Sequence, residues 1–363
     1  MNKIIFIAGG GTGGHLFPAI SIGSQLTKNN FSVIYIGSKY GIEKEYFKKN
    51  SFTYYLLNIR GLQRTLSFRS LFINILLPFR FIVSYLLSMK IIKKHNPSAI
   101  IGTGGYASAI PLIVGSHLKI PIIIQEQNSI PGMITKKLSK KASKIFLGFE
   151  SSKQILNSNN CIYTGNPIRN NLKILNKNNS KKKLGFDVNK KLILIIGGSQ
   201  GAHPINNHIL NNITFYINNN YQLLWQCGNY DYKNIKNKIN NKFIKIENFI
   251  DDMSLAYSSS DLVISRAGAI AISELTYFKK AMILIPLPNA ANNHQKINAI
   301  YFEKQKACIR INQEKLCKGD LEKSINNILN NSELLKKLES NSNLLSNPNA
   351  TTQIINETIN LIL

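Results

Sequence analysis

Short apolar runs rich in isoleucine recur along this chain with helical stretches between them, and this alternation constrains the fold more than any other feature. Nearly continuous apolar strands alternating with helices are typical of parallel sheets that are covered by helices on both faces. The sequence therefore predicts an α/β protein. The expected strands are residues 3–7, 32–36, 53–57, 99–101, 121–124, 145–147 and 161–163, followed by 192–196, 222–226, 243–246, 262–264, 282–285 and 308–311.

A stretch rich in lysine and asparagine, from about residue 170 to 191, divides these strands into two series. The chain has 363 residues, which is enough for two domains with separate cores. Both halves open alike, with an apolar strand, a glycine turn and a helix. We therefore expect two doubly wound, Rossmann-like domains that face each other across a cleft. Residues 351–363 are predicted to form one amphipathic helix.

The net charge is +27, and either nucleic acid or an anionic membrane would be a suitable partner for such a chain. Lysine, asparagine and isoleucine are abundant everywhere, loops included, so compositional bias is the preferred explanation of the charge. The charge is still expected to draw the protein towards anionic lipid and anionic substrates. No RNP-like or helix-turn-helix motif is found, which argues against nucleic acid.

The cysteines indicate a reducing compartment. Cys161, Cys227, Cys308 and Cys317 form no CxxC pair and are expected to be reduced thiols, as in a cytoplasmic protein. The apolar run at the start of the chain is too short for a secretory signal and leads directly into glycines.

Residues 71–92 form the longest apolar stretch and are long enough to span a bilayer. Pro78 and Arg80 lie near the middle, and an arginine at the bilayer centre costs about 2.5–3.5 kcal/mol. An amphipathic stretch that lies on the surface is therefore preferred to a span, with burial in the first core as the other alternative. The side chains expected to enter the membrane boundary, with Arg69 and Arg80 among them, are Phe72, Ile75, Leu76, Phe79 and Ile82.

The first strand runs into a glycine turn at residues 9–14 that satisfies GxGxxG, a weak signal by itself. An NAD site would need an acidic residue near the end of the second strand, where Gly37 and Ser38 stand instead. A P-loop would need a lysine after the glycines. The remaining interpretations are a turn where the backbone closely approaches a ligand beside a helix N-terminus, which favours anions, or a tight turn without a ligand.

His15 follows this turn at the start of the expected helix. The positive end of a helix disfavours the imidazolium, so His15 is expected to be neutral and able to accept a proton. A structural role is the alternative for an isolated histidine.

Two further glycine turns follow strands in the second half, at residues 197–202 and 265–269. Amides at the start of the helix after the third turn are suited to holding a diphosphate. Glu274, one turn into that helix, is a candidate acceptor for ribose hydroxyls, unless it is an ordinary surface glutamate. Three such turns together predict a nucleotide site, because open α/β sheets bind ligands at the carboxyl ends of their strands.

Metal binding is poorly supported by the sequence. There is no HExxH or DxD motif, and the spacing of His203 and His208 takes them off one helical face. The acidic pair Asp251-Asp252 is better explained as a solvated turn. We expect neither a metal nor an organic cofactor.

Eight segments together resemble one family in both order and spacing. They are GGGTGGHLFPA (9–19), GTGGYAS (102–108), EQN (126–128), GNPIR (165–169), GGSQGA (197–202), FIDDM (249–253), SRAGAxxxSE (265–274) and NNHQ (292–295). The family is MurG, the UDP-N-acetylglucosamine:undecaprenyl-diphospho-muramoyl-pentapeptide N-acetylglucosaminyltransferases, and the likeness covers roughly residues 3–300. It implies a GT-B fold, an inverting mechanism and a peripheral position on the cytoplasmic face of the cell membrane.

The resemblance also implies roles for the two domains and for individual residues. Residues 1–166 would be the acceptor and membrane-side domain, with the helix at 349–363 packed back on it, and residues 167–346 would bind the UDP-sugar. The residues implied for the donor are Thr12, Gly13, Gly14, Asn128, Arg169, Ser199, Ile250 (to uracil, through its backbone), Ala269, Ile270, Ala271, Ile272, Ser273, Glu274 and Gln295 (to the sugar hydroxyls).

By this resemblance, the reaction is one displacement at the anomeric carbon of UDP-N-acetylglucosamine by the 4-hydroxyl of the muramoyl sugar of lipid I. His15 is the first choice for general base and Glu126 the second. Many family members have histidine before Glu126, whereas this chain has Gln125, which puts a proton-handling role of that position in doubt. The alternatives are a transferase that acts on diacylglycerol and a non-catalytic protein that binds nucleic acid or membrane.

Overall fold

The computed structural model describes residues 3–62 and 67–363, apart from the side chains of residues 69 and 70. The chain divides into two compact units. Unit 1 comprises Met1–Asn170 with Pro348–Leu363, and unit 2 comprises Asn171–Asn347. The chain thus leaves unit 1 four residues later than the sequence predicts, and it returns to unit 1 for its last helix.

Unit 1 contains a parallel sheet of seven strands in the order β3-β2-β1-β4-β5-β6-β7. The strands are β1 (Ile4–Ala8), β2 (Ser32–Ser38), β3 (Tyr54–Leu57), β4 (Ala99–Gly102), β5 (Ile122–Glu126), β6 (Lys144–Leu147) and β7 (Cys161–Tyr163). The helices are α1 (Gly13–Lys28), α2 (Glu43–Lys49), α3 (Phe68–Ile75), α4 (Leu77–His95), α5 (Tyr106–His117), α6 (Met133–Leu138), α7 (Ser151–Leu156) and α17 (Ala350–Ile362).

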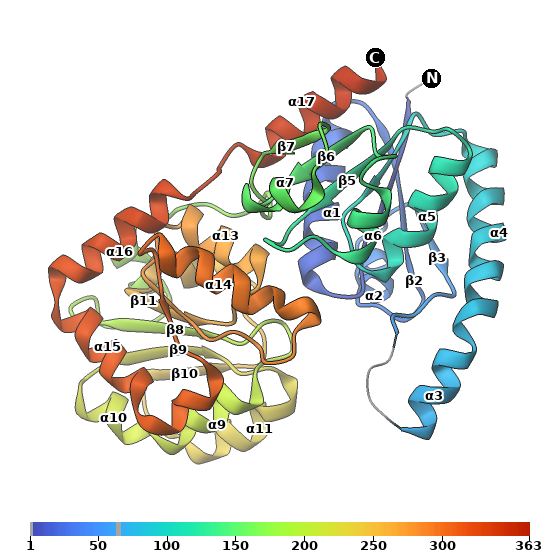
Figure 1. Cartoon of the computed structure of the whole chain (residues 1–363). Coiled ribbons are helices and arrows are strands. Elements are labelled where there is room, and N and C mark those ends of the chain that lie inside the picture. The colour runs from blue at the N-terminus through green and yellow to red at the C-terminus, as the bar shows by residue number, and fades with distance from the viewer. Residues whose placement is uncertain (1–2, 63–66) are drawn as a thin grey trace. The chain divides into compact units, whose positions relative to one another are not determined.

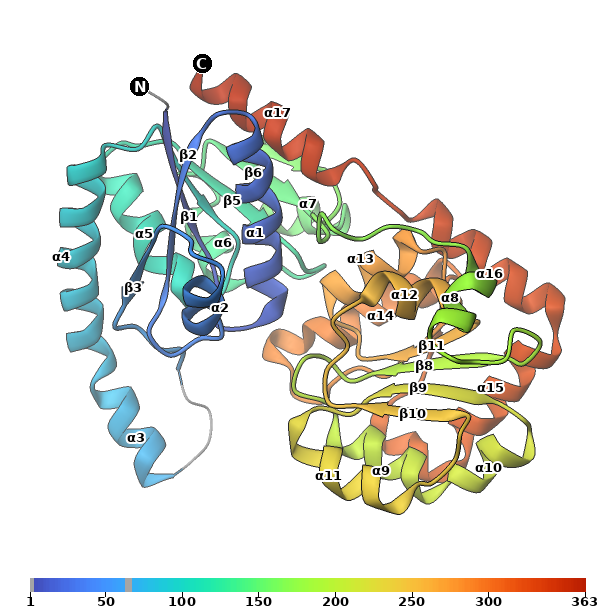
Figure 2. The same cartoon turned by 180° about the vertical axis from the view of Figure 1, so that it is seen from behind.

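Helices cover both faces of this sheet (Figures 1 and 2). One core joins the sheet to α1, α2 and α17, and a second core joins it to α4, α5, α6 and α7. Burial on both faces explains why strands such as Ile122–Glu126 read as continuous apolar runs. Helix α17, which the sequence predicts at 351–363, packs on α1.

Unit 2 contains a parallel sheet of six strands in the order β10-β9-β8-β11-β12-β13. The strands are β8 (Leu192–Ile196), β9 (Gln222–Gln226), β10 (Ile244–Glu247), β11 (Leu262–Ser265), β12 (Met282–Leu284) and β13 (Ile309–Arg310). The helices are α8 (Lys177–Lys183), α9 (His203–Asn211), α10 (Ile213–Asn218), α11 (Asn229–Lys238), α12 (Met253–Ser259), α13 (Ala269–Tyr277), α14 (His294–Lys304), α15 (Asp320–Asn330) and α16 (Ser332–Leu344), with 3-10 turns η1 (Ala291–Asn293) and η2 (Gln313–Lys318).

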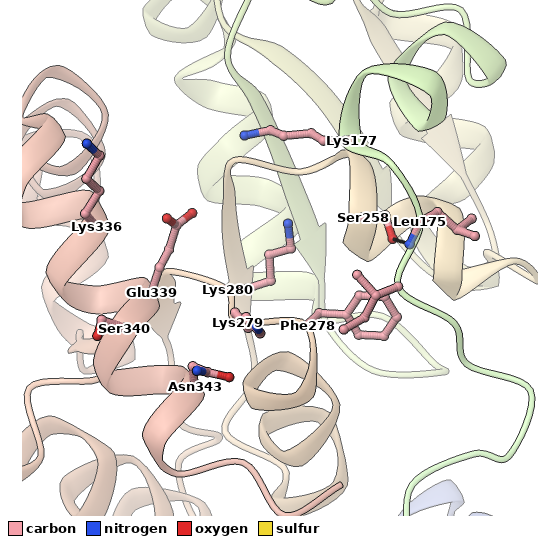
Figure 3. Close-up of a pocket in the computed structure, with 11 residues that line it drawn as sticks. Leu175, Lys177, Ser258, Phe278, Lys279, Lys280, Lys336, Glu339, Ser340 and Asn343 are labelled. Carbon is pink, nitrogen blue, oxygen red and sulfur yellow. Dashed lines mark hydrogen bonds between the residues drawn. The ribbon is translucent and has the colours of Figure 1, made fainter.

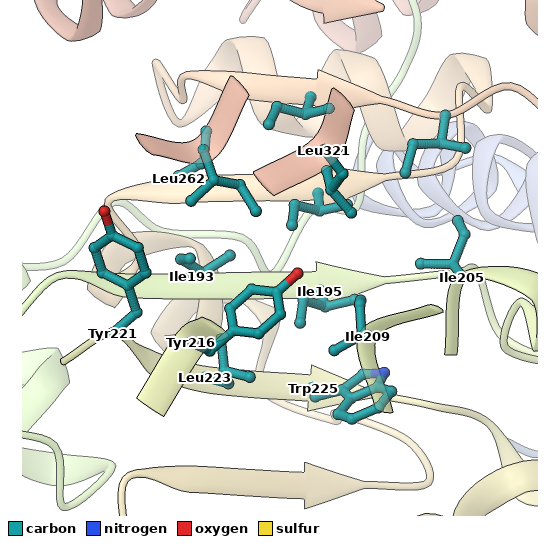
Figure 4. Close-up of a cluster of buried hydrophobic side chains, with 14 of the residues drawn as sticks. Ile193, Ile195, Ile205, Ile209, Tyr216, Tyr221, Leu223, Trp225, Leu262 and Leu321 are labelled. Carbon is teal, nitrogen blue, oxygen red and sulfur yellow. The ribbon is translucent and has the colours of Figure 1, made fainter. Parts of the chain in front are cut away.

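One core of unit 2 lies between its sheet and the flanking helices, where Tyr216 and Trp225 are fully buried among isoleucines of the central strands (Figure 4). The indole N–H of Trp225 donates to Asn206 at 3.0 Å, so its one polar atom is satisfied. In both units the strand order reverses at the first strand of the sheet, as in doubly wound folds. The predicted α/β class with two doubly wound domains is confirmed.

The apolar stretch at 71–92 forms two helices rather than one. Helix α3 ends at Ile75, and α4 begins at Leu77 with Pro78 in its first turn, where the missing N–H of proline does no harm. Within residues 3–62 and 67–363, no helix is long and apolar enough to cross a bilayer. Phe72 and Phe79 are 65% and 68% exposed, so these two side chains are not part of the first core.

Candidate active site

In unit 1, the predicted base lies where neighbouring strands end. Ala8 of β1 pairs with Gly102 of β4, which places the glycine turn after β1 beside the GTGGYAS segment. His15 lies in the first turn of α1, and its Nδ1 is 3.1 Å from the Thr103 carbonyl and 3.0 Å from Gln127 Oε1. Both partners accept hydrogen bonds, so Nδ1 carries the proton of the neutral ring and Nε2 is its basic nitrogen.

Gln127 has a fixed orientation, and this orientation sets the tautomer of His15. Its Nε2 donates to the Thr103 carbonyl at 2.6 Å and also to the side chain of Gln125, which leaves Oε1 facing the imidazole. Gln125 in turn donates to Asn166 at 3.0 Å. Gln125 therefore supports a polar chain that ends at His15. Sequence reasoning missed Gln127, although it lies within the EQN motif.

Glu126 is surrounded by donors from its own loop. Its carboxylate accepts from the Asn128 amide at 3.2 Å, the Gly132 amide at 2.8 Å and the Thr135 hydroxyl at 2.6 Å, and the residue is 5% exposed. These bonds tie residues 128–132 to the start of α6. Both oxygens of the Glu126 carboxylate are thus engaged by donors of this loop, which suits the residue to holding the loop in place. The geometry therefore favours His15 over Glu126 as base.

The first glycine turn rests on Glu43, which the sequence analysis did not identify. Glu43 is fully buried at the start of α2, and its carboxylate accepts from the amides of Gly11 at 2.7 Å and Ser38 at 2.8 Å. A Cβ on Gly10 would lie 2.3 Å from the carboxyl carbon of Glu43. Since Glu43 follows no motif, only its position after the second strand could have drawn attention to it.

The other donor residues predicted in unit 1 lie around the same strand ends. Thr12 is the N-cap of α1 and is exposed, as is Gly14. Asn128 is half-buried beside Glu126, and the guanidinium of Arg169 lies 5.3 Å from the centre of the Phe17 ring.

In unit 2, the second and third glycine turns are neighbours. Ile196 of β8 pairs with Ser265 of β11, so the turns that follow these two strands start side by side. The second turn contains the exposed Ser199. Gln226, at the end of β9, joins this turn to Ile250, the residue predicted to contact uracil. Its side chain donates to the Gly198 carbonyl at 2.9 Å and accepts from the Ile250 amide at 2.9 Å.

The third turn leads into α13 through Gly268, whose φ of −71° and ψ of 135° are those of an ordinary N-cap. The first intrahelical bond is donated by Ile272 to the Gly268 carbonyl, so the amides of Ala269, Ile270 and Ala271 precede it. Such amides at a helix start are a ready site for an anion. This is the arrangement that the sequence predicts for a diphosphate.

A buried arginine supports the third turn. Arg266 donates to the carbonyls of Ile285 and Pro286 at 3.2 and 3.1 Å and to Gln313 at 2.6 Å. Burial lowers the pKa of Arg266 to about 10, which still leaves it charged at neutral pH. Arg266 therefore ties the third turn to the residues after β12 and to η2 through its buried guanidinium.

Glu274 is buried rather than on a surface. It is 3% exposed and accepts from the Tyr257 hydroxyl at 2.9 Å. The alternative of an ordinary surface glutamate is therefore wrong. Ser273 is partly exposed and its hydroxyl bonds to the Ala269 carbonyl at 2.9 Å, while Gln295 accepts from the Leu287 amide at 2.9 Å.

The predicted site residues thus form two groups, one at the strand ends of each unit. His15, Glu126 and five donor residues belong to unit 1, and the remaining donor residues belong to unit 2. Within the described part of the chain, no three histidine, cysteine, aspartate or glutamate side chains are gathered as a metal site requires.

Comparisons with known proteins identify the family. Residues 5–147 match the glycosyltransferase family 28 N-terminal domain, and residues 192–354 match the family 28 C-terminal domain. A UDP-N-acetylglucosamine–N-acetylmuramyl-(pentapeptide) pyrophosphoryl-undecaprenol N-acetylglucosamine transferase from Flavobacterium psychrophilum is 38% identical over 370 residues, covering 100% of this chain and 99% of the relative. A Bacillus pumilus protein of the same name is 34% identical, with 97% of each chain covered.

The crystal structure of Acinetobacter baumannii MurG has the same fold, with a TM-score of 0.77 at 24% identity over 99% of both chains. The eight segments found in the sequence and the full-length relatives thus agree. The chain belongs to glycosyltransferase family 28 and, within it, to the MurG family.

Proposed function

We propose that this chain transfers N-acetylglucosamine from its UDP-linked form to the 4-hydroxyl of the muramoyl sugar of lipid I, which gives lipid II. The observation that carries the proposal is the full-length relationship to transferases whose name states this reaction. The architecture of the strand ends supplies a base in unit 1 and an anion-binding helix start in unit 2.

His15 acts on the acceptor. Its Nε2 takes the proton of the 4-hydroxyl as the oxygen attacks the anomeric carbon, the bond from that carbon to the diphosphate breaks, and UDP leaves with the electron pair. The configuration inverts from α to β. The bond from Nδ1 to Gln127 stabilises the imidazolium that forms, and general-base assistance of this kind contributes about 10²–10⁴-fold.

Unit 2 binds the donor. The amides at the start of α13 and the charge of Arg266 stabilise the diphosphate as it becomes the leaving group. Because the Ile250 amide is donated to Gln226, the carbonyl of Ile250 is the group left to contact uracil. Glu274 accepts from the ribose hydroxyls. The remaining contacts proposed for the donor are those of Thr12, Gly13, Gly14, Asn128, Arg169, Ser199, Ser273 and Gln295.

The direct test is a transfer assay with radiolabelled UDP-N-acetylglucosamine. Lipid I and diacylglycerol are offered in separate reactions, and the labelled lipids are separated by chromatography. Label on lipid I and none on diacylglycerol is expected. Label on diacylglycerol alone would replace the proposed acceptor, and label on neither would argue against transfer to lipids.

We also propose that the protein works as a peripheral protein on the cytoplasmic face of the cell membrane. Helix α4 packs on α5, and its buried face contains Ser84 and Ser88. Its large apolar side chains point outwards and continue those of α3. We call this set the apolar patch: Phe68, Leu71, Phe72, Ile75, Phe79, Phe81, Ile82, Val83, Leu86 and Leu87, all 39–95% exposed.

An exposed apolar surface of this size marks an interaction site. Lys90, Lys93 and Lys94 on the same helix are exposed and can meet anionic headgroups. Arg80 is directed elsewhere, because its guanidinium lies 5.7 Å from the centre of the Tyr40 ring. The predicted role of Arg69 falls on a side chain outside the described residues. The apolar patch with its lysines therefore supports binding to the bilayer that holds the acceptor.

Flotation with liposomes tests this proposal. Phe72→Asp with Phe79→Asp should abolish binding to anionic liposomes and leave the protein folded, because both rings are exposed. The matched control is Ile217→Asp with Leu344→Asp, which changes exposed apolar side chains of unit 2 and should float like the wild type. Equal flotation of both double variants would place the contact elsewhere on this basic chain.

A further inference from the structure

A pocket lies in unit 2, away from the strand ends that hold the proposed donor site. Its volume is about 510 Å³. It lies beyond the last residue of α13, at Phe278, whereas the third glycine turn is at the first residue of the same helix. The nine residues of α13 separate the two places by about 13 Å along the helix axis. The pocket is therefore distinct from the donor site.

Positive charge dominates this pocket. Lys177, Lys279, Lys280 and Lys336 line it, against one carboxylate, Glu339. Figure 3 shows the ammonium groups of Lys177 and Lys280 and the carboxylate of Glu339 directed towards the same space. Ammonium groups that outnumber the nearby carboxylates at a partly buried site attract an ion of negative charge.

Lys280 is the best-placed of these cations. It is 8% exposed, and its Nζ donates to the Ser260 carbonyl at 2.8 Å, which uses one of the three protons of an ammonium group. Burial lowers the pKa of Lys280 to about 8, with a further lowering by Lys177. A bound anion would therefore relieve a real electrostatic cost at this position.

The negative charges nearby do not cancel the lysines. Asp261 is shared between Lys177 and Lys181 and also accepts from the Leu192 amide at 2.8 Å. Burial raises the pKa of Glu339, so its charge is itself poorly stabilised. Glu339 therefore compensates the charge of the lysines only weakly.

The opposite wall of the pocket is apolar. Ile174, Leu175 and Phe278 supply it, and Ile174 is 55% exposed. A ligand that fits both walls has an anionic end and a small apolar part. Lysine ammonium groups are common partners of phosphate.

We propose that this pocket binds a small soluble phosphate monoester, with its phosphate beside Lys177 and Lys280, its apolar part against Phe278, and the exposed Lys336 adding positive charge from α16. The ligand would touch both the first residues of unit 2, from Asn171 onwards, and α16, the last helix before the chain returns to unit 1. It thereby joins the two segments of unit 2 through which the chain enters and leaves.

Phenyl phosphate is the probe, and calorimetric titration of the full chain is the measurement. Saturating UDP is present throughout, so that the proposed donor site does not take up the phosphate. Saturable binding is expected, tighter than that of inorganic phosphate, which lacks the apolar part, and tighter than that of phenol, which lacks the charge. A separate titration with UDP alone checks the donor site. If UDP does not bind there, that result contradicts the proposed function and leaves the proposal for this pocket to be judged by phenyl phosphate.

Two neighbouring lysines of α16 give a matched pair of variants, because Lys336 and Lys337 are both exposed but only Lys336 lines the pocket. Lys336→Glu should weaken the binding of phenyl phosphate by about tenfold or more, whereas Lys337→Glu should change it by less than about twofold. Glu339→Gln should strengthen it. Equal losses in both lysine variants would show attraction to the overall charge, and absence of saturation in the wild type would overturn the proposal.

Discussion

The first and third glycine turns look alike in the sequence but are constructed differently. At the first turn, a Cβ on Gly11 would lie 2.8 Å from the ring of Tyr106, and one on Gly10 would meet the carboxylate of Glu43. At the third, a Cβ on Gly268 would meet no atom of the described residues within 4 Å. Glycine in unit 1 is thus required by the packing of the protein itself, whereas glycine in unit 2 leaves the backbone open to a ligand.

Exchange of glycine for alanine tests this comparison most directly, and the largest effect is expected at Gly10. The added methyl would overlap a carboxylate that two backbone amides hold in place, so Gly10→Ala should destabilise the fold by about 3 kcal/mol or more. The measurement is the unfolding temperature by scanning calorimetry, together with soluble yield.

Gly268→Ala is the matched change in unit 2. Its φ is ordinary and the space is open, so the unfolding temperature should stay close to that of the wild type. The affinity for UDP should fall, because the methyl would stand where the diphosphate approaches. A stable Gly10→Ala protein, or a Gly268→Ala protein with unchanged UDP affinity, would remove the contrast between the two turns.

The next effect separates the chemistry of unit 1 from the binding of unit 2. His15→Ala should lower turnover by about 100-fold or more, with little change in UDP affinity, because it removes the proposed base and leaves α13 intact. Gln127→Ala should lower turnover less, since it removes only the support of Nδ1. Turnover within about threefold of the wild type for His15→Ala would reject this base.

The sequence predicts the places of the glycine turns and of His15 well, because they depend on local order in the chain. Strand, glycines and helix are contiguous, so their places follow from the apolar pattern alone. The partners of His15 cannot be predicted from this pattern. Thr103 and Gln127 come from the ends of other strands, and only the register of β1 with β4 and of β4 with β5 brings them together. Glu43 was missed for the same reason.

A smaller effect is expected at Glu274, which tests whether the open turn of unit 2 binds a nucleotide. Glu274→Gln keeps the shape of the side chain and should weaken UDP binding by about 1–3 kcal/mol, the range for hydrogen bonds to a charged group. Tyr257→Phe, which removes one bond to Glu274 without touching ligand, should cost less. Titration with UDP and with 2′-deoxy-UDP gives the readout, since an unchanged preference for the ribose hydroxyl in Glu274→Gln would exclude this role.

The smallest effect is expected just after the C-terminus of α13, where Lys280 is buried. Its pKa is about 8 in the folded chain, against an ordinary value of 10.5, so between these pH values the unfolded chain binds more protons and stability rises with pH. Below pH 8 the buried ammonium is destabilising. Lys280→Met should therefore gain at least about 1 kcal/mol relative to the wild type at pH 7, and this difference should shrink towards pH 10.5. Urea unfolding in phosphate-free buffer measures it, and a difference that does not vary with pH would contradict the assigned shift.

Two features of unit 2 could not be predicted from the sequence, because both depend on which segments the fold packs together. Glu274 was left open between a ligand contact and a surface position, because helical spacing alone does not reveal that α12 places Tyr257 against it. The pocket beyond α13 was not foreseen either, since its lysines come from α8, from the residues after α13 and from α16. Only the fold brings these segments together.

The return of the chain to unit 1 has a consequence for biosynthesis. Ile354 and Ile355 of α17 lie in the same core as Leu16 and Ile22 of α1, so the core on this face of the unit 1 sheet stays incomplete until the residues after Pro348 have been made. At ribosomal rates of about 5–20 residues per second, the addition of unit 2 takes roughly 9–35 seconds. The core that contains α17 is therefore the last to be completed, after the other core of unit 1, which uses no residue beyond Cys161, and after unit 2.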